Sequence, residues 1–289
     1  ATQGVFNMNA NPELNVDIQY LAYTRSLARQ RVLVRGFGLG FHDGRTGLTK
    51  TDNRSAAARA LDHKNIRLGT FGGDLIAALP ARKTTVDLLA WGAGQIGSWG
   101  LLHHSAAAVA LEAGLRFDAV KSSPWLRGGY FRSTGDNNPT DGTHNTFFQV
   151  LPTPRIYARF PFFNAMNSTD SFAQLIDKPL KPLELRSDLH FLRLTEPGDL
   201  WYQGGGAFDN KVFGYTGRPA SNRDSFATLF DLSADYALSK QLSLGMYFAH
   251  AFGKGAVSAI YPTHPGSNYG YFELSYKFGH PLTGGPGPH

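Results

Sequence analysis

The sequence predicts an all-β fold, an antiparallel transmembrane β-barrel, and three observations carry this prediction. Apolar and polar residues alternate with period two in segment after segment, as in strands with one apolar and one polar face. Glycine (33 residues), proline (16 residues) and aromatic residues (13%) are frequent, which suits many strands and turns. Several segments are about ten residues long, the length that a tilted strand needs to cross a bilayer.

Composition excludes several classes of protein. No run approaches the roughly 18 to 20 apolar residues of a membrane-spanning helix, and the absence of cysteine excludes disulfides, thiolate metal sites and cysteine nucleophiles. The net charge of +6 suggests an anionic partner. The chain starts at Ala1 without a charged-then-apolar leader, so we expect a signal peptide to be removed or to lie outside this sequence.

Alternation predicts roughly twelve strands. The candidate segments in chain order are 14–24, 31–41, 65–79, 84–91, 99–117, 125–132, 155–163, 183–194, a weaker 200–215, 226–236, 242–248 and 269–278. An alanine-rich patch at 55–61 predicts a helical turn. Long connections are expected at 42–63, 135–153, 165–181, 204–224 and 253–268, and a short hairpin at 234–242. Long loops on one side and short turns on the other are typical of outer-membrane barrels.

The polar faces of these segments carry ionisable residues. Segment 183–194 shows this clearly, because its leucines and Phe191 share one face and its ionisable residues share the other. In 125–132 the alternation leaves Arg127 or Arg132 as the inward residue. Candidates for the lining of a lumen are Arg35, Arg67, Glu112, Arg116, Arg127, Arg132, Arg159, Glu184, Arg186, Asp188, His190, Asp231, Asp235, Glu273 and Lys277. In a soluble sandwich the same positions would simply face solvent.

The stretch 124–164 is the most distinctive part of the sequence. It has two aromatic, arginine-bearing segments on either side of a loop of turn-forming residues. Asp136, Asn138, Asp141 and His144 are expected at the mouth of a pore. Asp136, Asn138 and Asp141 partly match a calcium loop, but Phe147 stands where the bidentate glutamate belongs. A turn held by Asx hydrogen bonds is the alternative.

Other motifs predict no catalysis, no cofactor and no metal. Gly92, Gly94 and Gly97 match a dinucleotide-binding fingerprint, but the chain lacks the alternating strands and helices which that motif requires. Asp231 and Asp235 stand four apart on one strand, too far for a retaining glycosidase pair. Basic residues are interspersed with acids, so nucleic-acid binding is not predicted. We therefore expect a protein that is not an enzyme.

The loop text resembles the bacterial alginate-export family of outer-membrane β-barrels. The residues that carry this resemblance are the run 133–144 (STGDNNPTDGTH), 146–148 (TFF), 151–153 (LPT), 192–194 (LRL), 199–202 (DLWY), 91–100 (WGAGQIGSWG) and 271–278 (YFELSYKF). The resemblance spans roughly 65–278. It implies an outer-membrane pore with a basic lumen, and up to eighteen strands where the family architecture holds.

The expected function is passive diffusion or export of anionic solutes, including an acidic polysaccharide such as alginate. The lumen arginines would lower the barrier for anions. We expect one barrel domain over 1–278, a short tail over 279–289, and a bacterial outer membrane with lipopolysaccharide around it. A scaffold barrel plugged by its loops or by an envelope partner protein is the first alternative, and a soluble carbohydrate-active β-protein is the second.

Overall fold

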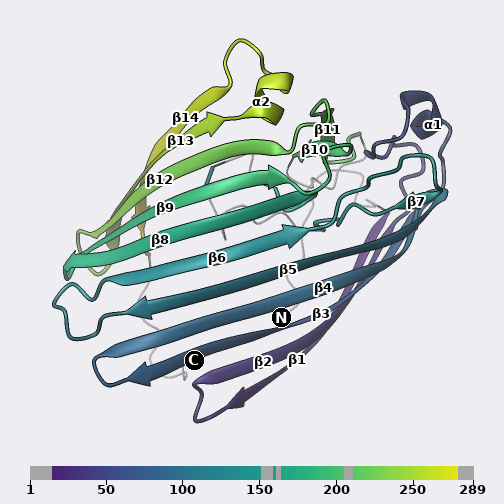
Figure 1. Ribbon diagram of the computed structural model, residues 1–289. Helices are drawn as coiled ribbons and strands as arrows, with labels where there is room; N and C mark the ends of the chain where they lie inside the picture. The colour runs from purple at the N-terminus through teal and green to yellow at the C-terminus, as the bar shows by residue number, and fades with distance from the viewer. Residues whose placement is uncertain (1–14, 151–158, 161–163, 205–210, 279–289) are drawn as a thin grey trace.

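The computed structural model describes residues 15–150, 159–160, 164–204 and 211–278. Its main feature is a twelve-stranded sheet, and a separate pair of short strands lies in a connection (Figure 1). The strands are β1 (Val16–Leu27), β2 (Val32–Asp43), β3 (Ile66–Ala81), β4 (Thr84–Trp99), β5 (Leu102–Arg116), β6 (Trp125–Ser133), β7 (Thr143–His144), β8 (Ser168–Leu180), β9 (Leu183–Leu194), β10 (Leu200–Gln203), β11 (Thr216–Pro219), β12 (Ser225–Ala237), β13 (Leu242–Gly253) and β14 (Gly266–Tyr276).

The long strands pair in chain order, each antiparallel to the next, from β1 to β14, while β7 pairs in parallel with β5 and β10 pairs with β11. Figure 1 shows this sheet twisted and curled. Such a meander is consistent with a barrel wall, and in the described residues β1 and β14 are its two edges, not paired with each other. The predicted all-β antiparallel architecture is confirmed.

Most connections are short at one end of the sheet and long at the other, as the sequence predicts; the exceptions are the two-residue turn 100–101 between β4 and β5 and the eight residues 117–124 between β5 and β6. Tight hairpins join β1 to β2, β3 to β4, β8 to β9 and β12 to β13, and they gather at one end of the sheet (Figure 1). The opposite end carries the long connections, with α1 (Ala56–Ala60), β7, β10, β11 and α2 (Gly255–Ile260). Helix α1 is the predicted helical turn, and Ser55 Oγ caps it by accepting the N–H of Ala58 at 3.2 Å. None of the described helices has the length and hydropathy for a membrane span.

Three expectations from the sequence need correction. The range 165–181 is not a loop, because strand β8 occupies most of it. The segment 200–215 is not one strand, because β10 ends at Gln203 and pairs with β11 in a small two-stranded sheet. Most of 155–163 lies outside the described residues, and its described members Arg159 and Phe160 are not in a strand.

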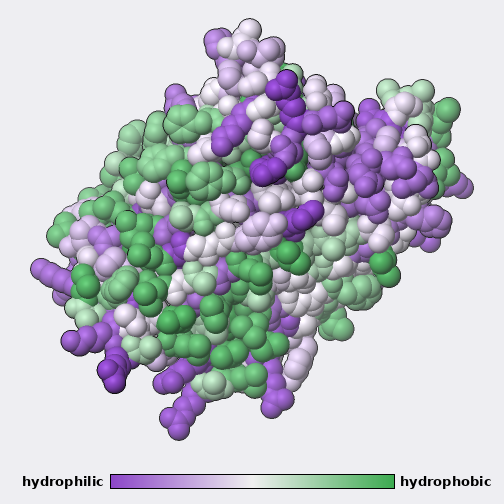
Figure 2. Space-filling view, in the orientation of Figure 1, coloured by the Kyte–Doolittle hydropathy of each residue, from purple (hydrophilic) through white to green (hydrophobic). Residues whose placement is uncertain are grey.

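The two faces of the sheet differ sharply. We call the face with the buried side chains the inner face; in β5 it carries Leu102, His104, Ala106, Ala108 and Ala110. The outer face exposes large apolar side chains on nearly every long strand: Phe71, Leu75, Leu88, Ile96, Val109, Leu111, Leu115, Leu126, Tyr130, Leu175, Leu189, Phe191, Phe230, Leu232, Met246, Phe248, Phe272 and Leu274. In Figure 2 hydrophobic residues form a broad patch over the strands, with hydrophilic residues toward the ends. Soluble monomers rarely expose such a surface, which suits contact with lipid.

Strand β1 carries apolar side chains on both faces. Ile18 and Tyr20 stand opposite Phe41 and Leu39 of β2 and so lie on the inner face, while Leu21 and Tyr23 are exposed on the outer face. The ring centroids of Tyr20 and Phe37 lie 6.3 Å apart. Asp17 belongs to the outer face and accepts from His42 at 3.4 Å near the end of the strand. Alternation therefore does not separate an apolar from a polar face in this strand, and the inward face follows from its register with β2.

Candidate functional site

The inner face carries arginines that are held by carboxylates of the same or of neighbouring strands. Arg127 of β6 is the clearest example. Its Nη2 donates to Glu112 Oε2 at 2.6 Å and its Nε to Asp87 Oδ1 at 3.3 Å. Its Nη1 donates to Gln174 Oε1 at 3.2 Å. Trp125 also donates to Asp87, at 2.6 Å, and its ring lies 4.8 Å from the Arg127 guanidinium carbon. Four adjacent strands thus fix one guanidinium group.

In three of these pairs the arginine is the more exposed partner. The Arg35 side chain is 42% exposed while that of Asp74 is 6% exposed, and their atoms lie 2.6 Å apart. Arg127 is 19% exposed against 9% for Glu112. For Arg186 and Asp188 the fractions are 25% and 1%. The carboxylates are therefore buried against the wall, and the guanidinium groups form the more accessible layer on the inner face.

Arg159 reaches the same face from the β6–β8 connection. Its Nη2 lies 3.7 Å from Asp235 Oδ2, and its guanidinium carbon lies 5.9 Å from the centroid of the Tyr247 ring. Here the acid is the more exposed partner. Asp235 of β12 and Glu273 of β14 flank Gly245, which lies on the strand between them, β13. This connection therefore adds a cation to a patch of the wall that is otherwise acidic.

The register of the strands places most of the candidate lining residues on the inner face. They are Arg35, Glu112, Arg116, Arg127, Glu184, Arg186, Asp188, His190, Asp231, Asp235 and Glu273. Lys277 follows the end of β14, and its N–H donates to Gln241 O. Arg67 and Arg132 lie on the outer face instead: Arg67 alternates with the buried Ile66 and Leu68, and Arg132 pairs with the outward Val109. Of the two alternatives on β6, Arg127 is the inward residue.

The β6–β8 connection folds back against the inner face. Phe148 is buried against Phe41 and Trp99, with ring centroids 5.1 Å away in both cases. Phe147 packs against Trp91, at 6.4 Å, and against the small side chains of β5. Gln95 of β4 holds the backbone here, because its Oε1 accepts the N–H of Phe148 at 2.7 Å and its Nε2 donates to Phe148 O at 2.9 Å.

A cavity of about 380 Å³ lies beside this connection. Phe147, Phe148 and Val150 line one part of it, while Arg35 and Glu112 of the wall line another. The other described end of the connection also packs on the wall, because Phe160 belongs to the buried cluster around Leu229 and Tyr247. The connection thus contacts β2, β4 and β5 with one end and β12 and β13 with the other.

Asp199 fastens the connection at the end of the sheet that carries the long loops. Its Oδ2 accepts from Thr146 Oγ1 at 2.6 Å and from the N–H of Asp136 at 3.0 Å. Its Oδ1 accepts from Tyr202 Oη and from the N–H of Leu200, both at 2.7 Å. All these groups are buried or nearly so. Because one carboxylate satisfies donors from both the β6–β8 and β9–β12 connections, it joins two long loops.

Two histidines form a second attachment. His104 of β5 and His144 of β7 are buried with their Nδ1 atoms 2.9 Å apart. The Trp99 ring stacks on His144 with centroids 4.3 Å apart. Burial lowers the pKa of His144 well below its ordinary value, so the imidazole is neutral. One ring can then donate to the other.

The aspartates and asparagine of the loop form successive turns. Asp136 Oδ1 accepts the N–H of Asn138 at 3.0 Å, and Asn138 Oδ1 accepts that of Thr140 at 3.1 Å. Asp141 Oδ1 accepts the N–H of Thr143 at 2.8 Å. Each bond spans two residues, as in an Asx turn. The geometry therefore supports a turn scaffold at this place.

We expect the Asp136→Asn variant to stabilise the loop above pH 6. Burial raises the pKa of Asp136 to about 6 from 3.8, with Asp199 and Asp141 adding repulsion. The neutral acid therefore favours the folded loop: its contribution is complete below pH 3.8 and is lost as the pH rises through about 6. Hydrogen exchange of the 134–150 amides at pH 7.5 should show opening that costs about 1 to 2 kcal/mol more in the variant.

At pH 3 the same comparison serves as the control. Wild type and variant should then exchange alike, because Asp136 is largely protonated in both the folded and the open loop and asparagine has a similar shape. Equal protection at both pH values would contradict the raised pKa of Asp136.

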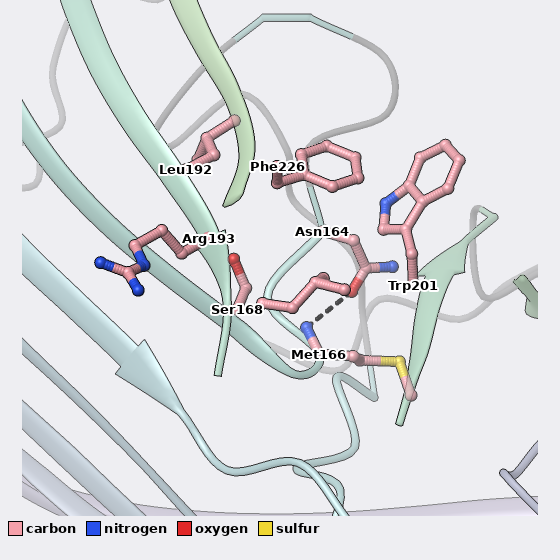
Figure 3. A pocket seen from close by; sticks show the side chains of 8 residues that line it. Asn164, Met166, Ser168, Leu192, Arg193, Trp201 and Phe226 are labelled. Atoms are coloured by element: carbon pink, nitrogen blue, oxygen red, sulfur yellow. Dashed lines mark hydrogen bonds between the residues drawn. The ribbon is translucent and has the colours of Figure 1, made fainter. Parts of the chain in front are cut away.

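A smaller pocket opens between β8, β9 and β10 (Figure 3). Met166 donates its N–H to Asn164 Oδ1 at 2.7 Å, and the rings of Trp201 and Phe226 close the opposite side. Its volume of about 20 Å³ suffices for about one water molecule. This pocket is therefore packing space and not a solute path.

Several residues of the site are absent from the sequence-based candidates. Asp170 accepts from His190, Gln174 from Arg127, and Asp199 joins the long loops. A buried ionic network in the β2–β3 connection was also missed: Arg54 binds both Asp52 and Asp62, at 2.8 and 2.9 Å. Alternation in β8 places Asp170 and Gln174 on one face, but the polar composition of 165–181 favours a loop, so neither residue is predicted.

Comparison with known proteins agrees with the architecture. A protein-family model described as alginate export matches residues 11–258, which is most of the chain. The match begins before residue 65, where the resemblance was expected to start, and does not include β14. A comparison with curated proteins found no match. Alginate export is a family of outer-membrane transport proteins and not of enzymes. The chain belongs to the alginate export family.

Proposed function

We propose that this chain forms the wall of an outer-membrane channel through which anionic solutes, including acidic polysaccharide of the alginate type, move by passive diffusion. The observation that carries the proposal is the layering on the inner face, with Arg35, Arg127 and Arg186 more exposed than the acids that hold them. A solute inside the wall meets guanidinium groups first. Guanidinium groups bind carboxylates well, in paired hydrogen bonds.

The buried acids make this binding weak and brief. Asp74, Glu112 and Asp188 already accept from these guanidinium groups, and Arg127 also donates to Asp87 and Gln174. A passing carboxylate would therefore compete with partners that are fixed in the wall and would not displace them. Conduction needs binding that is favourable enough for entry and weak enough for exit. The pairs meet both requirements without a cofactor.

The outer face supports a position in a bilayer. Its apolar side chains would contact lipid, and the ends of the strands would lie in the headgroup regions. In outer-membrane barrels the long loops are extracellular and the short turns are periplasmic. By this rule α1, α2 and the β6–β8 connection lie at the extracellular end of the barrel, on the side of the membrane that carries lipopolysaccharide.

One observation favours a second candidate function. Phe147, Phe148 and Phe160 fill space on the inner face, so the connection narrows or plugs the interior. A barrel closed in this way would serve as a scaffold for an envelope partner protein. The scaffold would give no ion conductance, whereas a channel narrowed by the connection would conduct.

Reversal potentials in planar bilayers test the channel. Under a potassium chloride gradient we expect anion selectivity for the wild type. Replacing Arg35 by glutamine should lower the chloride-to-potassium permeability ratio about two- to fivefold, because it removes a cation and uncovers Asp74. The effect should weaken at high salt.

Arg132→Gln is the matched control, since this arginine lies on the outer face. It removes the same charge and should leave selectivity unchanged. Cation selectivity of the wild type, or no conductance, would refute the proposed anion channel. Equal effects of both substitutions would show that the selectivity does not arise on the inner face.

A further inference from the structure

Three ligand-forming side chains converge on the inner face at the contact between β9 and β12. Asp188, His190 and Asp231 each offer an atom, and these atoms lie within 4.8 Å of one another. All three residues are buried. Among the described residues no other group of three histidine, aspartate or glutamate side chains has this geometry. The cluster therefore adds a histidine and a second carboxylate to the Arg186–Asp188 pair.

Strand register fixes this cluster. Asp231 and Asp188 are directly opposite each other in the β12–β9 ladder. His190 follows Asp188 by two residues, so it lies on the same face of the same strand. The aromatic ring of Phe172 covers His190, with centroids 5.4 Å apart, and Gly129 gives that ring room, since a Cβ there would lie 2.4 Å from it. Three side chains on paired strands form a rigid group.

The hydrogen bonds of the cluster do not satisfy all of its carboxylate oxygens. Arg186 Nε donates to Asp188 Oδ2 at 2.6 Å, and Tyr247 Oη donates to Asp231 Oδ2 at 3.0 Å. Asp188 Oδ1 is buried and has no hydrogen-bond partner among the described residues. Arg186 supplies one positive charge to Asp188, so the two facing carboxylates keep a negative charge and a buried acceptor without a donor, which a bound cation or a shared proton would offset.

His190 is oriented as a metal-binding imidazole would be. Its Nδ1 lies 2.7 Å from Asp170 Oδ2 on β8. A carboxylate partner of this kind sets the tautomer of a ligating histidine, turns the other nitrogen toward the metal and raises its basicity. Nε2 is then the ligand atom. The tetrad of Asp170, His190, Asp188 and Asp231 thus contains a ligand set and the group that positions it.

We propose that Asp188, His190 and Asp231 bind one divalent zinc-class cation in the wall of the barrel. One imidazole nitrogen and two carboxylate oxygens are typical zinc ligands, and water would complete a tetrahedral set. Calcium and magnesium prefer sites made of oxygen alone and in greater number. The bound cation would join β9 to β12 and cancel the negative charge of the facing carboxylates.

Zinc content measured on the protein extracted in detergent, without a polyhistidine tag, tests the site. After equilibrium dialysis against buffered zinc we expect one tightly bound zinc per chain. Asp188→Asn should weaken binding at least about a hundredfold, because it removes a ligand charge. Asp170→Asn should weaken it about ten- to a hundredfold, because it acts through His190. Calcium and magnesium at equal concentration should not displace zinc.

Asp235→Asn is the control variant, since Asp235 lies on the same strand and face as Asp231 but outside the cluster. It should bind zinc as the wild type does. Cobalt substitution in the wild type gives a second readout that needs no variant to fold: a tetrahedral visible absorption band is expected, and zinc should bleach it. Zinc bound equally by all variants, or no cobalt band, would overturn the proposal. So would an infrared band of a protonated carboxyl group that zinc does not remove, since it would indicate a shared proton.

Discussion

Replacing Phe147 and Phe148 together by alanine is expected to raise the single-channel conductance severalfold. Both rings lie on the inner face, where Phe148 packs on Phe41 and Trp99. Their removal widens the interior and weakens the attachment of the connection, since each buried phenylalanine contributes about 3 to 5 kcal/mol to packing. Single-channel recordings of wild type and double variant in the same lipid measure the change.

Phe71→Ala is the matched control, because Phe71 is 61% exposed on the outer face of β3. It removes a phenyl ring from the same wall without changing the interior, so the conductance should stay at the wild-type value. Unchanged conductance in the double variant would mean that these rings do not limit the ion path.

Replacing Asp199 by alanine should release the β6–β8 connection from the wall. Thr146, Asp136, Leu200 and Tyr202 would each lose an acceptor in a buried place. A buried donor without a partner costs about 1 to 3 kcal/mol, so the total loss should reach about 3 kcal/mol or more. Limited proteolysis within 134–150 should become much faster, while the sheet itself remains folded.

Asp224→Ala provides the comparison. Asp224 lies in the same β9–β12 connection and binds Arg193, but both side chains are substantially exposed. An exposed ion pair contributes about 1 kcal/mol or less, so proteolysis within 134–150 should change little. Equal protection in the Asp199 variant and the wild type would contradict the role of Asp199 as the fastening of both loops.

The strands could be predicted from the sequence because burial on one face imposes a period of two. In β9 this period is complete, and Asp188 and His190 lie on the inner face with Glu184 and Arg186. The prediction was less successful where both faces have similar polarity. Strand β1 turns its Ile18 and Tyr20 inward because its partner strand presents Phe41 and Leu39 there, and this depends on register.

Contacts between distant segments could not be predicted in this way. Asp199 meets Thr146 across 53 positions, and Gln95 meets Phe148 across the same separation. Such pairs depend on how a long connection folds back, which local alternation does not encode. Asp170 was missed for a different reason: β8 carries polar residues and Pro179, so its range had the composition of a loop.

The layering of arginines over buried acids also restricts the order in which mutations can accumulate. If Arg35 is lost first, Asp74 remains as a buried charge without its partner, a costly intermediate. If Asp74 is lost first, the exposed Arg35 is still solvated by water, and its later loss is mild. A lineage that reduces the positive charge of this wall is thus expected to lose the acid before the arginine. The change in selectivity, which comes with the loss of the arginine, is then the second step.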